Sequence, residues 1–233
     1  MSIGPEVRQY FAKHAGRYDE LVGSLAFQLT DAYSYLACYL ARQLSQERRP
    51  RVLELGIGTG ALTRHLLMAC EALCVTGIDA SPEMLRQARH NLHGYEERLS
   101  LVCGEFPDAI PEAEYDCVVS GMALSFYGID HAALFRRVHR ALISGGCFAY
   151  AANVTQNASS VENVIAKMLG DRVSLSREQW EFLRQIRGKL RIFEPPIDWH
   201  TAQLRQTGFL DVDCIYLRYK LGIFAGIRPR VAL

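Results

Sequence analysis

The most constraining feature of the sequence is a regular alternation of short apolar segments with stretches of helical periodicity. Between the segments, apolar residues recur at spacings of three and four, as Met84, Leu85, Ala88 and Leu92 do, which is typical of a helix with one buried face. Strands that alternate with helices form parallel sheets with right-handed crossovers. The sequence therefore predicts an α/β fold with strands at 51–55, 73–78, 99–103, 115–120 and 147–152.

Residues outside this alternation are expected to form two helical regions and a final hairpin. An apolar stripe from Leu29 to Leu44 predicts a helix near the N-terminus, and residues 153–194 are polar with helical spacing. The strand-like segments Val212–Tyr219 and Leu221–Ile227 are separated by one residue, so they must pair as an antiparallel hairpin. The apolar residues expected to anchor the second helical region are Val164, Met168, Trp180, Leu183 and Ile186.

These segments divide the chain into four parts. We expect an N-terminal helical lid at 1–50, a Rossmann-like core at 51–152, a helical cap insertion at 153–196, and the end of the core at 197–233. The last part supplies a helix from Trp199 to Gln206 and the hairpin. The predicted fold is thus a Rossmann-like, doubly wound, seven-stranded sheet with an antiparallel last strand.

Composition and charge narrow the classes of function. The 233 residues carry 26 Lys and Arg against 25 Asp and Glu, and this formal charge of +1 argues against nucleic acid or a membrane surface as the partner. No apolar run reaches the roughly 20 residues that cross a bilayer. The odd number of cysteines, seven, predicts reduced thiols and a cytoplasmic protein. Cys70 and Cys74 lack the third cysteine of an iron–sulfur site, so no metal site is expected.

The segment Val52–Gly60, with the sequence VLELGIGTG, carries the main functional signal. Its glycines allow a sharp turn from strand to helix and let a ligand lie against bare backbone. Asp79 stands 19 residues after Gly60, at the end of the next predicted strand. There its carboxylate can accept both ribose hydroxyls of a nucleoside, so the sequence predicts a nucleoside site at this edge of the sheet.

Two nucleoside cofactors compete for this site. Gly56, Gly58 and Ala61 satisfy the relaxed dinucleotide fingerprint, which would suit NAD. Glu54, however, lies two residues before the first glycine, where it would repel a pyrophosphate and attract the ammonium of an amino-acid tail. S-adenosylmethionine carries such an ammonium, a ribose and a sulfonium, and it has no phosphate. The charge of Glu54 therefore favours S-adenosylmethionine.

From Val52 onward the sequence resembles the class I S-adenosylmethionine-dependent methyltransferases. The segment Val52–Gly60 resembles the first motif of that family, and Gly77–Leu85 is similar to its ribose-binding strand end and the helix that follows. Gly104–Phe106 resembles the adenine-contacting turn, and the strand segments at 115–120 and 221–227 also match in order. The resemblance implies methyltransferase activity, with S-adenosylmethionine as cofactor and S-adenosylhomocysteine as product.

The resemblance also implies roles for individual residues. Gly56, Gly58 and Gly60 would form the floor under the methionine and ribose parts, with Glu54 near the ammonium, and Asp79 would bind the ribose. Tyr18 and Tyr10 resemble lid aromatics that close over the cofactor, and the family more often has Asp where Glu105 stands. The remaining implied contacts, around the ribose, the adenine and the sulfonium, are Ala80, Met84, Glu105, Phe106, Ser120, Gly121 and Met122.

The acceptor site is less visible, because methyl transfer from a sulfonium mainly needs alignment and exclusion of water. Tyr127, in the loop after the fourth strand, and His200, as a general base, are the catalytic candidates. The chain lacks the Asn-Pro-Pro-Tyr motif of amino-group methylation and the Pro-Cys nucleophile of cytosine methylation. We therefore expect a small-molecule acceptor, methylated on O, N or C in a biosynthetic reaction.

Other functions stay open at this point. The short C-terminal hairpin suggests a non-methylating enzyme similar to a carboxy-S-adenosylmethionine synthase. Basic clusters such as Arg48–Arg51 would suit an RNA-modifying methyltransferase or a noncatalytic RNA-binding module, although solvated helix faces explain them as well. A homodimer is compatible with the two helical regions.

Overall fold

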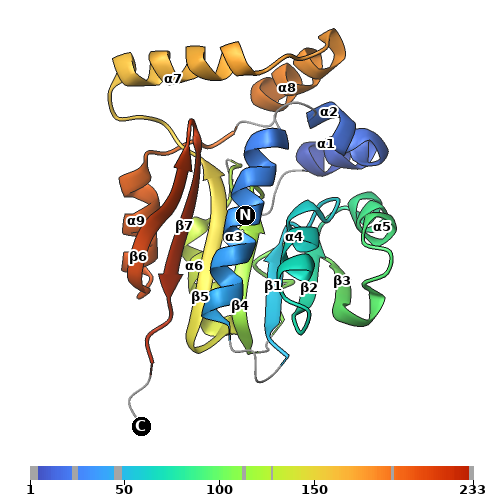
Figure 1. The fold of residues 1–233 in the computed structure, drawn as a ribbon, viewed down its shortest axis with the longest axis vertical. Coiled ribbons are helices and arrows are strands. Elements are labelled where there is room, and N and C mark those ends of the chain that lie inside the picture. The colour runs from blue at the N-terminus through green and yellow to red at the C-terminus, as the bar shows by residue number, and fades with distance from the viewer. Residues whose placement is uncertain are drawn as a thin grey trace.

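A seven-stranded sheet in the order β3-β2-β1-β4-β5-β7-β6 forms the centre of the molecule (Figure 1). The structure is a computed structural model that describes residues 5–22, 26–44, 49–111, 114–126, 128–189 and 192–230. Strands β1 to β5 pair in parallel, whereas β7 runs antiparallel to both β5 and β6, which confirms the predicted fold class. The strands are β1 Arg51–Leu55, β2 Cys74–Asp79, β3 Leu99–Cys103, β4 Tyr115–Gly121, β5 Leu142–Asn153, β6 Leu210–Arg218 and β7 Leu221–Ile227.

Helices cover both faces of this sheet (Figure 1). Helices α3 (Ala26–Gln43) and α4 (Ala61–Ala69) pack on one face, over a core that includes Val52, Val119 and Ile223. Helices α6 (His131–Ala141) and α9 (Ile197–Gln206) contribute to the core of the opposite face. Helix α5 (Pro82–Asn91) and the short η3 (Glu96–Arg98) lie near β2 and β3. The strand order reverses between β1 and β4, and crevices at such a reversal are where α/β sheets bind ligands.

Local sequence explains where helix α5 begins. The Ser81 hydroxyl accepts a hydrogen bond from the Met84 backbone N–H at 3.2 Å, and Pro82 occupies the first helical position, as the sequence predicts. One boundary differs, because the sequence predicts the fifth strand only from residue 147. In the structure β5 begins at Leu142, which is fully buried and pairs with Tyr115 of β4, so strand pairing starts directly after α6.

Two groups of helices lie beyond the carboxyl ends of the strands (Figure 1). The first comprises α1 (Pro5–His14), η1 (Ala15–Arg17) and α2 (Tyr18–Val22), and the second comprises α7 (Ser159–Arg172) and α8 (Arg177–Lys189). They meet in a small apolar core of their own, centred on Leu21, Phe182 and Ile186.

The anchoring expected of helices α7 and α8 is found on α8 alone. Leu183 and Ile186 pack into the small apolar core, as predicted. The predicted anchors Val164, Met168 and Trp180 are 59%, 50% and 59% exposed, so this part of the prediction was wrong. Val164 and Met168 are exposed because α7 contributes no buried side chain, whereas Trp180 belongs to α8 but lies outside the small apolar core.

One ionic cluster ties the base of α7 to the rest of the fold. The Lys220 ammonium, at the turn between β6 and β7, lies 2.6 Å from the Glu162 carboxylate of α7 and 3.1 Å from the Glu194 carboxylate.

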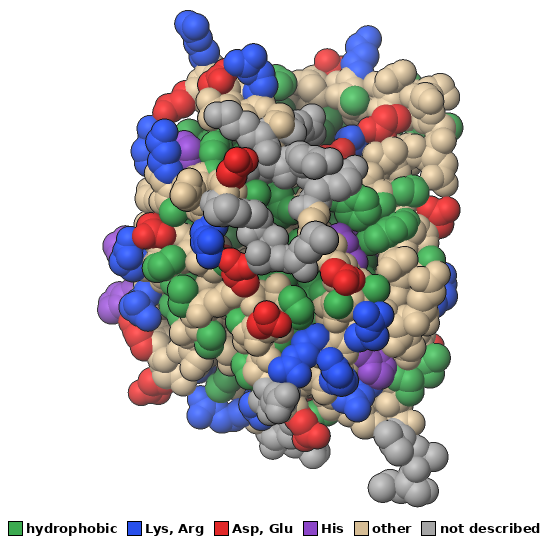
Figure 2. Space-filling model, turned by 180° about the vertical axis from the view of Figure 1, so that it is seen from behind, with side chains coloured by type: hydrophobic (Ala, Val, Ile, Leu, Met, Phe, Trp, Pro, Cys, Tyr) green, Lys and Arg blue, Asp and Glu red, His purple; other side chains and the backbone are tan. Residues whose placement is uncertain are grey.

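Basic side chains project from the end of the molecule where α7 and α8 lie (Figure 2). None of the described helices has the length and hydropathy expected of a membrane span.

Candidate cofactor-binding site

The glycine-rich turn between β1 and α4 adopts a conformation that other residues would strain. Gly56, Gly58 and Gly60 have φ values of +70°, +55° and +87°. A Cβ at Gly56 would lie 2.2 Å from the Ala123 Cβ. The backbone of the turn therefore packs directly against the Ala123 side chain, in the loop after β4. A Cβ at Gly58, by contrast, would meet nothing within 4 Å. The turn is therefore closed on one side and open on the side where a ligand would lie against it.

Asp79, at the end of β2, points its carboxylate at this turn. It accepts hydrogen bonds from the backbone N–H of Gly58 and of Ser81, both at 2.9 Å. Burial raises the pKa of Asp79, while the hydrogen bonds from Ser81, Gly58 and Ala80 oppose that shift. The carboxylate is thus fixed at the carboxyl edge of two neighbouring parallel strands, where the ribose of a nucleoside would reach it.

Glu54, on β1, is 1% exposed and is not the solvated strand-end acid that a surface role would require. The Thr63 hydroxyl of α4 donates a hydrogen bond to its carboxylate. Burial raises the pKa of Glu54 to about 8, with the Thr63 bond opposing this shift and the charge of Asp79 adding to it. Among the described residues, neither Glu54 nor Asp79 forms an ion pair with a basic side chain.

These two acids make the site suited to a cationic nucleoside. Both carboxyls have a pKa raised by burial, and the charge of Asp79 adds to the shift of Glu54, so an arriving cation stabilises their ionised forms. The ammonium and sulfonium of S-adenosylmethionine supply that charge, and its ribose hydroxyls can donate to Asp79. A pyrophosphate would add negative charge beside Glu54. The residues present therefore fit S-adenosylmethionine better than a dinucleotide.

The N-terminal helices are attached to the site by polar contacts. The Asp19 carboxylate of α2 accepts hydrogen bonds from the Thr59 hydroxyl at 2.7 Å and from the Asn91 side-chain amide at 3.1 Å. The Arg8 guanidinium of α1 lies 2.7 Å from the Glu105 carboxylate, in the turn after β3. Sequence reasoning missed Asp19 and Arg8, because nothing local marks a polar residue whose partner lies tens of residues away.

The other residues implied by the family resemblance differ in exposure and in their contacts. Met84 and Phe106 are 3% and 8% exposed, and Ala80 is half-buried at the start of the turn before α5. The fully buried Ser120 hydroxyl donates to the Leu55 carbonyl at 2.8 Å, which joins the ends of β4 and β1. Met122 follows β4 with a φ of +73°, a strained conformation for a residue with a side chain.

Three tyrosines of the helices that precede β1 differ in what they contact. Burial raises the pKa of Tyr18 to about 12, and the charges of Asp19 and Asp79 add to the shift, which places Tyr18 beside the candidate site. Tyr10 instead packs against α8, where its hydroxyl donates to the Phe182 carbonyl at 3.2 Å. Tyr33, on α3, was expected only as part of an apolar stripe, yet its hydroxyl lies against Gly121.

The structure describes one of the two catalytic candidates. Tyr127 lies outside the described residues. His200 is 3% exposed on α9, where its Nδ1 lies 3.0 Å from the Tyr150 hydroxyl and its ring stacks on Phe224 at 4.1 Å. Burial lowers the pKa of His200 to about 3, so its imidazole is a weak base in this environment. Within the described part of the chain, no cluster of His, Cys, Asp and Glu is arranged to hold a metal ion.

Comparisons with known proteins agree with this geometry. A family model described as "Methyltransferase domain" matches residues 52–146. A biotin biosynthesis bifunctional protein of Bordetella avium is 39% identical over 46% of this chain and 23% of its own length. A demethylmenaquinone methyltransferase of Chlorobaculum tepidum is 30% identical over 60% of this chain and 57% of its own.

A solved structure shares the fold. The S-adenosylmethionine-dependent methyltransferase SibL, in its apo form, superposes with a TM-score of 0.61 at 24% identity, over 86% of this chain and 57% of its own. The chain therefore spans less than two thirds of each of these three proteins. At this level of identity the superposition shows the fold alone.

Proposed function

The chain belongs to the class I S-adenosylmethionine-dependent methyltransferases, and we propose that it transfers the methyl group of this cofactor to a small-molecule acceptor. The family match covers the glycine-rich turn, Asp79 and β4, which are the elements that build the candidate site. The two buried acids at that site support a cationic cofactor. The relative from Chlorobaculum tepidum is named for a small-molecule acceptor, demethylmenaquinone, which supports the acceptor class.

One observation carries the acceptor class in this chain. An apolar cluster joins the N-terminal helices, the loop after β4 and α8, with Phe126 packed among Phe11, Tyr18 and Phe182. Next to it a cavity of about 710 Å³ lies between α1, η1 and α8, with Tyr10, Leu21 and Phe182 among its lining residues. The hollow is open to solvent, and its volume is in the range of small-molecule sites.

The division of labour along the chain is part of the proposal. Residues 1–50 would act as a lid, 51–152 with 197–233 as the cofactor-binding core, and 153–196 as a cap over the acceptor. The contacts of Asp19 with Thr59 and Asn91 support the lid, since they attach α2 to the glycine-rich turn and to α5. The packing of Phe182 and Ile186 against Leu21 supports the cap.

The proposed chemistry is an in-line displacement at the methyl carbon. The acceptor atom attacks the methyl group, the bond from carbon to sulfur breaks, and the sulfur leaves with its electron pair as the neutral thioether of S-adenosylhomocysteine. The chain's own contribution is to hold cofactor and acceptor in line and to keep water out. We assign no proton transfer to His200, because its low pKa and burial make it a poor base.

The setting of the reaction belongs to the same proposal. A cytoplasmic location is supported by the cysteines, all of which are free thiols, and a biosynthetic role by the relative named for biotin biosynthesis. Cys117 and Cys147 occupy paired positions on β4 and β5 and are both buried and unbridged, which suits a reducing compartment. The balance of charge in the chain supports neither a nucleic-acid partner nor a membrane partner.

A transfer assay tests the function. The purified protein is incubated with S-adenosylmethionine labelled in the methyl group and with fractionated pools of small metabolites, of total protein and of RNA. We expect label in the small-metabolite pool with the wild type, and none with Asp79→Ala, which removes the proposed ribose contact while an exposed control, Asp198→Ala, keeps activity. Label only in protein or RNA would contradict the small-molecule acceptor. Label in no pool, with no binding of S-adenosylhomocysteine, would contradict methyl transfer altogether.

A further inference from the structure

Tyr33 brings a phenol to the carboxyl edge of β4. Its hydroxyl oxygen lies 2.8 Å from the position that a Cβ on Gly121 would occupy, so the glycine leaves room for the phenol. Glu54 pairs in register with Val119, and Gly121 is two residues further along β4. The Tyr33 hydroxyl is therefore on the same sheet face as Glu54 but nearer the end of the strands.

The surroundings of this hydroxyl are acidic and polar, although the residue belongs to the core. Tyr33 is 6% exposed, and burial raises its pKa far above the ordinary value, with Tyr18 and Glu54 adding to the shift. Among the described residues, none donates a hydrogen bond to its hydroxyl oxygen or accepts one from it. The hydroxyl oxygen is also not one of the fully enclosed polar atoms that lack a partner, so a molecule bound from outside the chain can reach it.

The chemistry of the cofactor and its product shows what this place could discriminate. S-adenosylmethionine and S-adenosylhomocysteine share the adenine, the ribose, the carboxylate and the ammonium. They differ at the sulfur, which is a cationic sulfonium with a methyl group before transfer and a neutral thioether afterwards. A group that contacts the ammonium binds both equally, whereas an electronegative atom beside the sulfur favours the cation.

We propose that the Tyr33 hydroxyl oxygen faces the sulfonium end of the bound cofactor, where it favours S-adenosylmethionine over S-adenosylhomocysteine. The inference rests on the proposed function, since it assumes that the crevice holds this cofactor. It assigns Tyr33 and Glu54 different tasks: Glu54 holds the ammonium common to both ligands, and Tyr33 selects the charged sulfur. This preference favours the replacement of S-adenosylhomocysteine by a new molecule of S-adenosylmethionine after each transfer.

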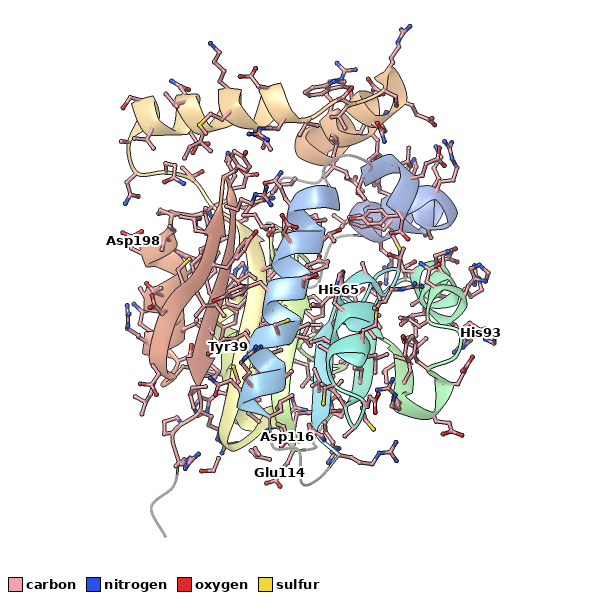
Figure 3. All side chains as sticks on the ribbon, in the orientation of Figure 1. Tyr39, His65, His93, Glu114, Asp116 and Asp198 are labelled. Carbon is pink, nitrogen blue, oxygen red and sulfur yellow. The ribbon has the colours of Figure 1, made fainter. Side chains whose placement is uncertain are left out.

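The test is a comparison of two dissociation constants in three variants. Titration calorimetry measures the affinity of the full chain for S-adenosylmethionine and for S-adenosylhomocysteine. Tyr33→Phe removes a single oxygen, and we expect it to weaken S-adenosylmethionine about tenfold and S-adenosylhomocysteine less than about twofold. Glu54→Gln should weaken both ligands by the same factor. Tyr39→Phe is the matched control, because Tyr39 lies further along α3, near Cys117 and Cys147, away from the crevice (Figure 3).

Each outcome decides a separate question. Equal effects of Tyr33→Phe on both ligands, or no effect on either, would overturn the role of Tyr33 and leave the proposed function standing. A wild type that binds neither ligand would overturn the proposed function itself. A second measurement uses the wild type alone. It takes an analogue of S-adenosylmethionine in which a carbon atom bearing a protonated amino group replaces the sulfonium, so that the positive charge is kept. We expect this analogue to bind more tightly than S-adenosylhomocysteine. The reverse order would contradict the inference even if Tyr33→Phe did not fold.

Discussion

The glycine-rich edge of the sheet and helix α7 differ in how tightly the fold constrains their residues. At the edge, three glycines have positive φ, Glu54 is 1% exposed, and Asp79 accepts two backbone hydrogen bonds. Helix α7 has no buried side chain and leaves Val164 and Met168 exposed. Almost any change at the edge alters packing or charge, whereas α7 can change with little effect on the rest of the fold.

This difference matters for the proposed function, in which the edge holds the cofactor and α7 belongs to the cap over the acceptor. The cofactor is the same in every turnover, so a rigid, preorganised edge lowers the free-energy cost of binding it. The cap faces the proposed acceptor site, and there only α8 is held by a small apolar core. The comparison predicts that substitutions at the edge change cofactor affinity and stability together, whereas those on α7 leave cofactor affinity unchanged and alter stability by about 1 kcal/mol or less.

The largest effect is expected from adding the same methyl group to a glycine in each region. Gly56→Ala would place a Cβ 2.2 Å from that of Ala123 at a φ of +70°, so we expect a loss of about 2–5 kcal/mol in the free energy of unfolding. Gly170→Ala, in α7, meets open space and should stabilise the protein by about 0.5–1 kcal/mol. Urea titrations measure both. Similar changes in the free energy of unfolding for the two variants would contradict the difference between the edge of the sheet and α7.

A smaller effect, with a distinctive pH dependence, is expected at Glu54. Its pKa rises from 4.5 in the unfolded chain to about 8 in the fold, so the folded state holds a proton that the unfolded state has lost. Stability from this group is therefore fully present below pH 4.5 and is lost as the pH rises through about 8. The total change is at most about 5 kcal/mol for a shift of this size.

Glu54→Gln removes that titration while keeping a group that can accept from Thr63. We expect the variant to be more stable than the wild type above pH 8 and similar to it below pH 5, although its cofactor affinity falls. Thermal unfolding across this pH range, without ligand, measures the difference. Identical pH profiles for the two proteins would show that Glu54 is not the buried acid described above. The control is Glu71→Gln, an exposed acid at the far end of α4.

The sequence predicts the edge of the sheet well because its constraints lie between near neighbours. The turn needs glycine at Gly56, Ser81 caps the helix that follows it, and Asp79 ends a strand, and each of these signals lies within a few residues. Tyr33 gave no separate signal, because periodicity places it in the apolar stripe of α3 and says nothing of where its hydroxyl reaches. Asp19 and Arg8 were missed for the same reason, since their partners are distant in sequence.

Helices α7 and α8 show what apolar periodicity in the sequence does not predict. Apolar residues at helical spacing predict that a helix has an apolar face, and both α7 and α8 form where the pattern indicates. The pattern does not contain the second element that covers such a face. Leu183 and Ile186 find one in α1 and α2, whereas Met168 and Trp180 do not. Burial is a property of two surfaces, and one segment of sequence describes only one of them.

The smallest effect is expected on the exposed face of α7, and it sharpens the comparison within the cap itself. Met168 is 50% exposed, so Met168→Gln should change the free energy of unfolding by less than about 0.5 kcal/mol. Ile186→Ala, in α8, should cost about 2–4 kcal/mol because it leaves a cavity beside Leu21 and Phe182. The two variants are compared by urea titration at several protein concentrations. A large, concentration-dependent loss for Met168→Gln would contradict the exposed state of α7, because only a face buried against a second copy of the chain could lose stability in that way.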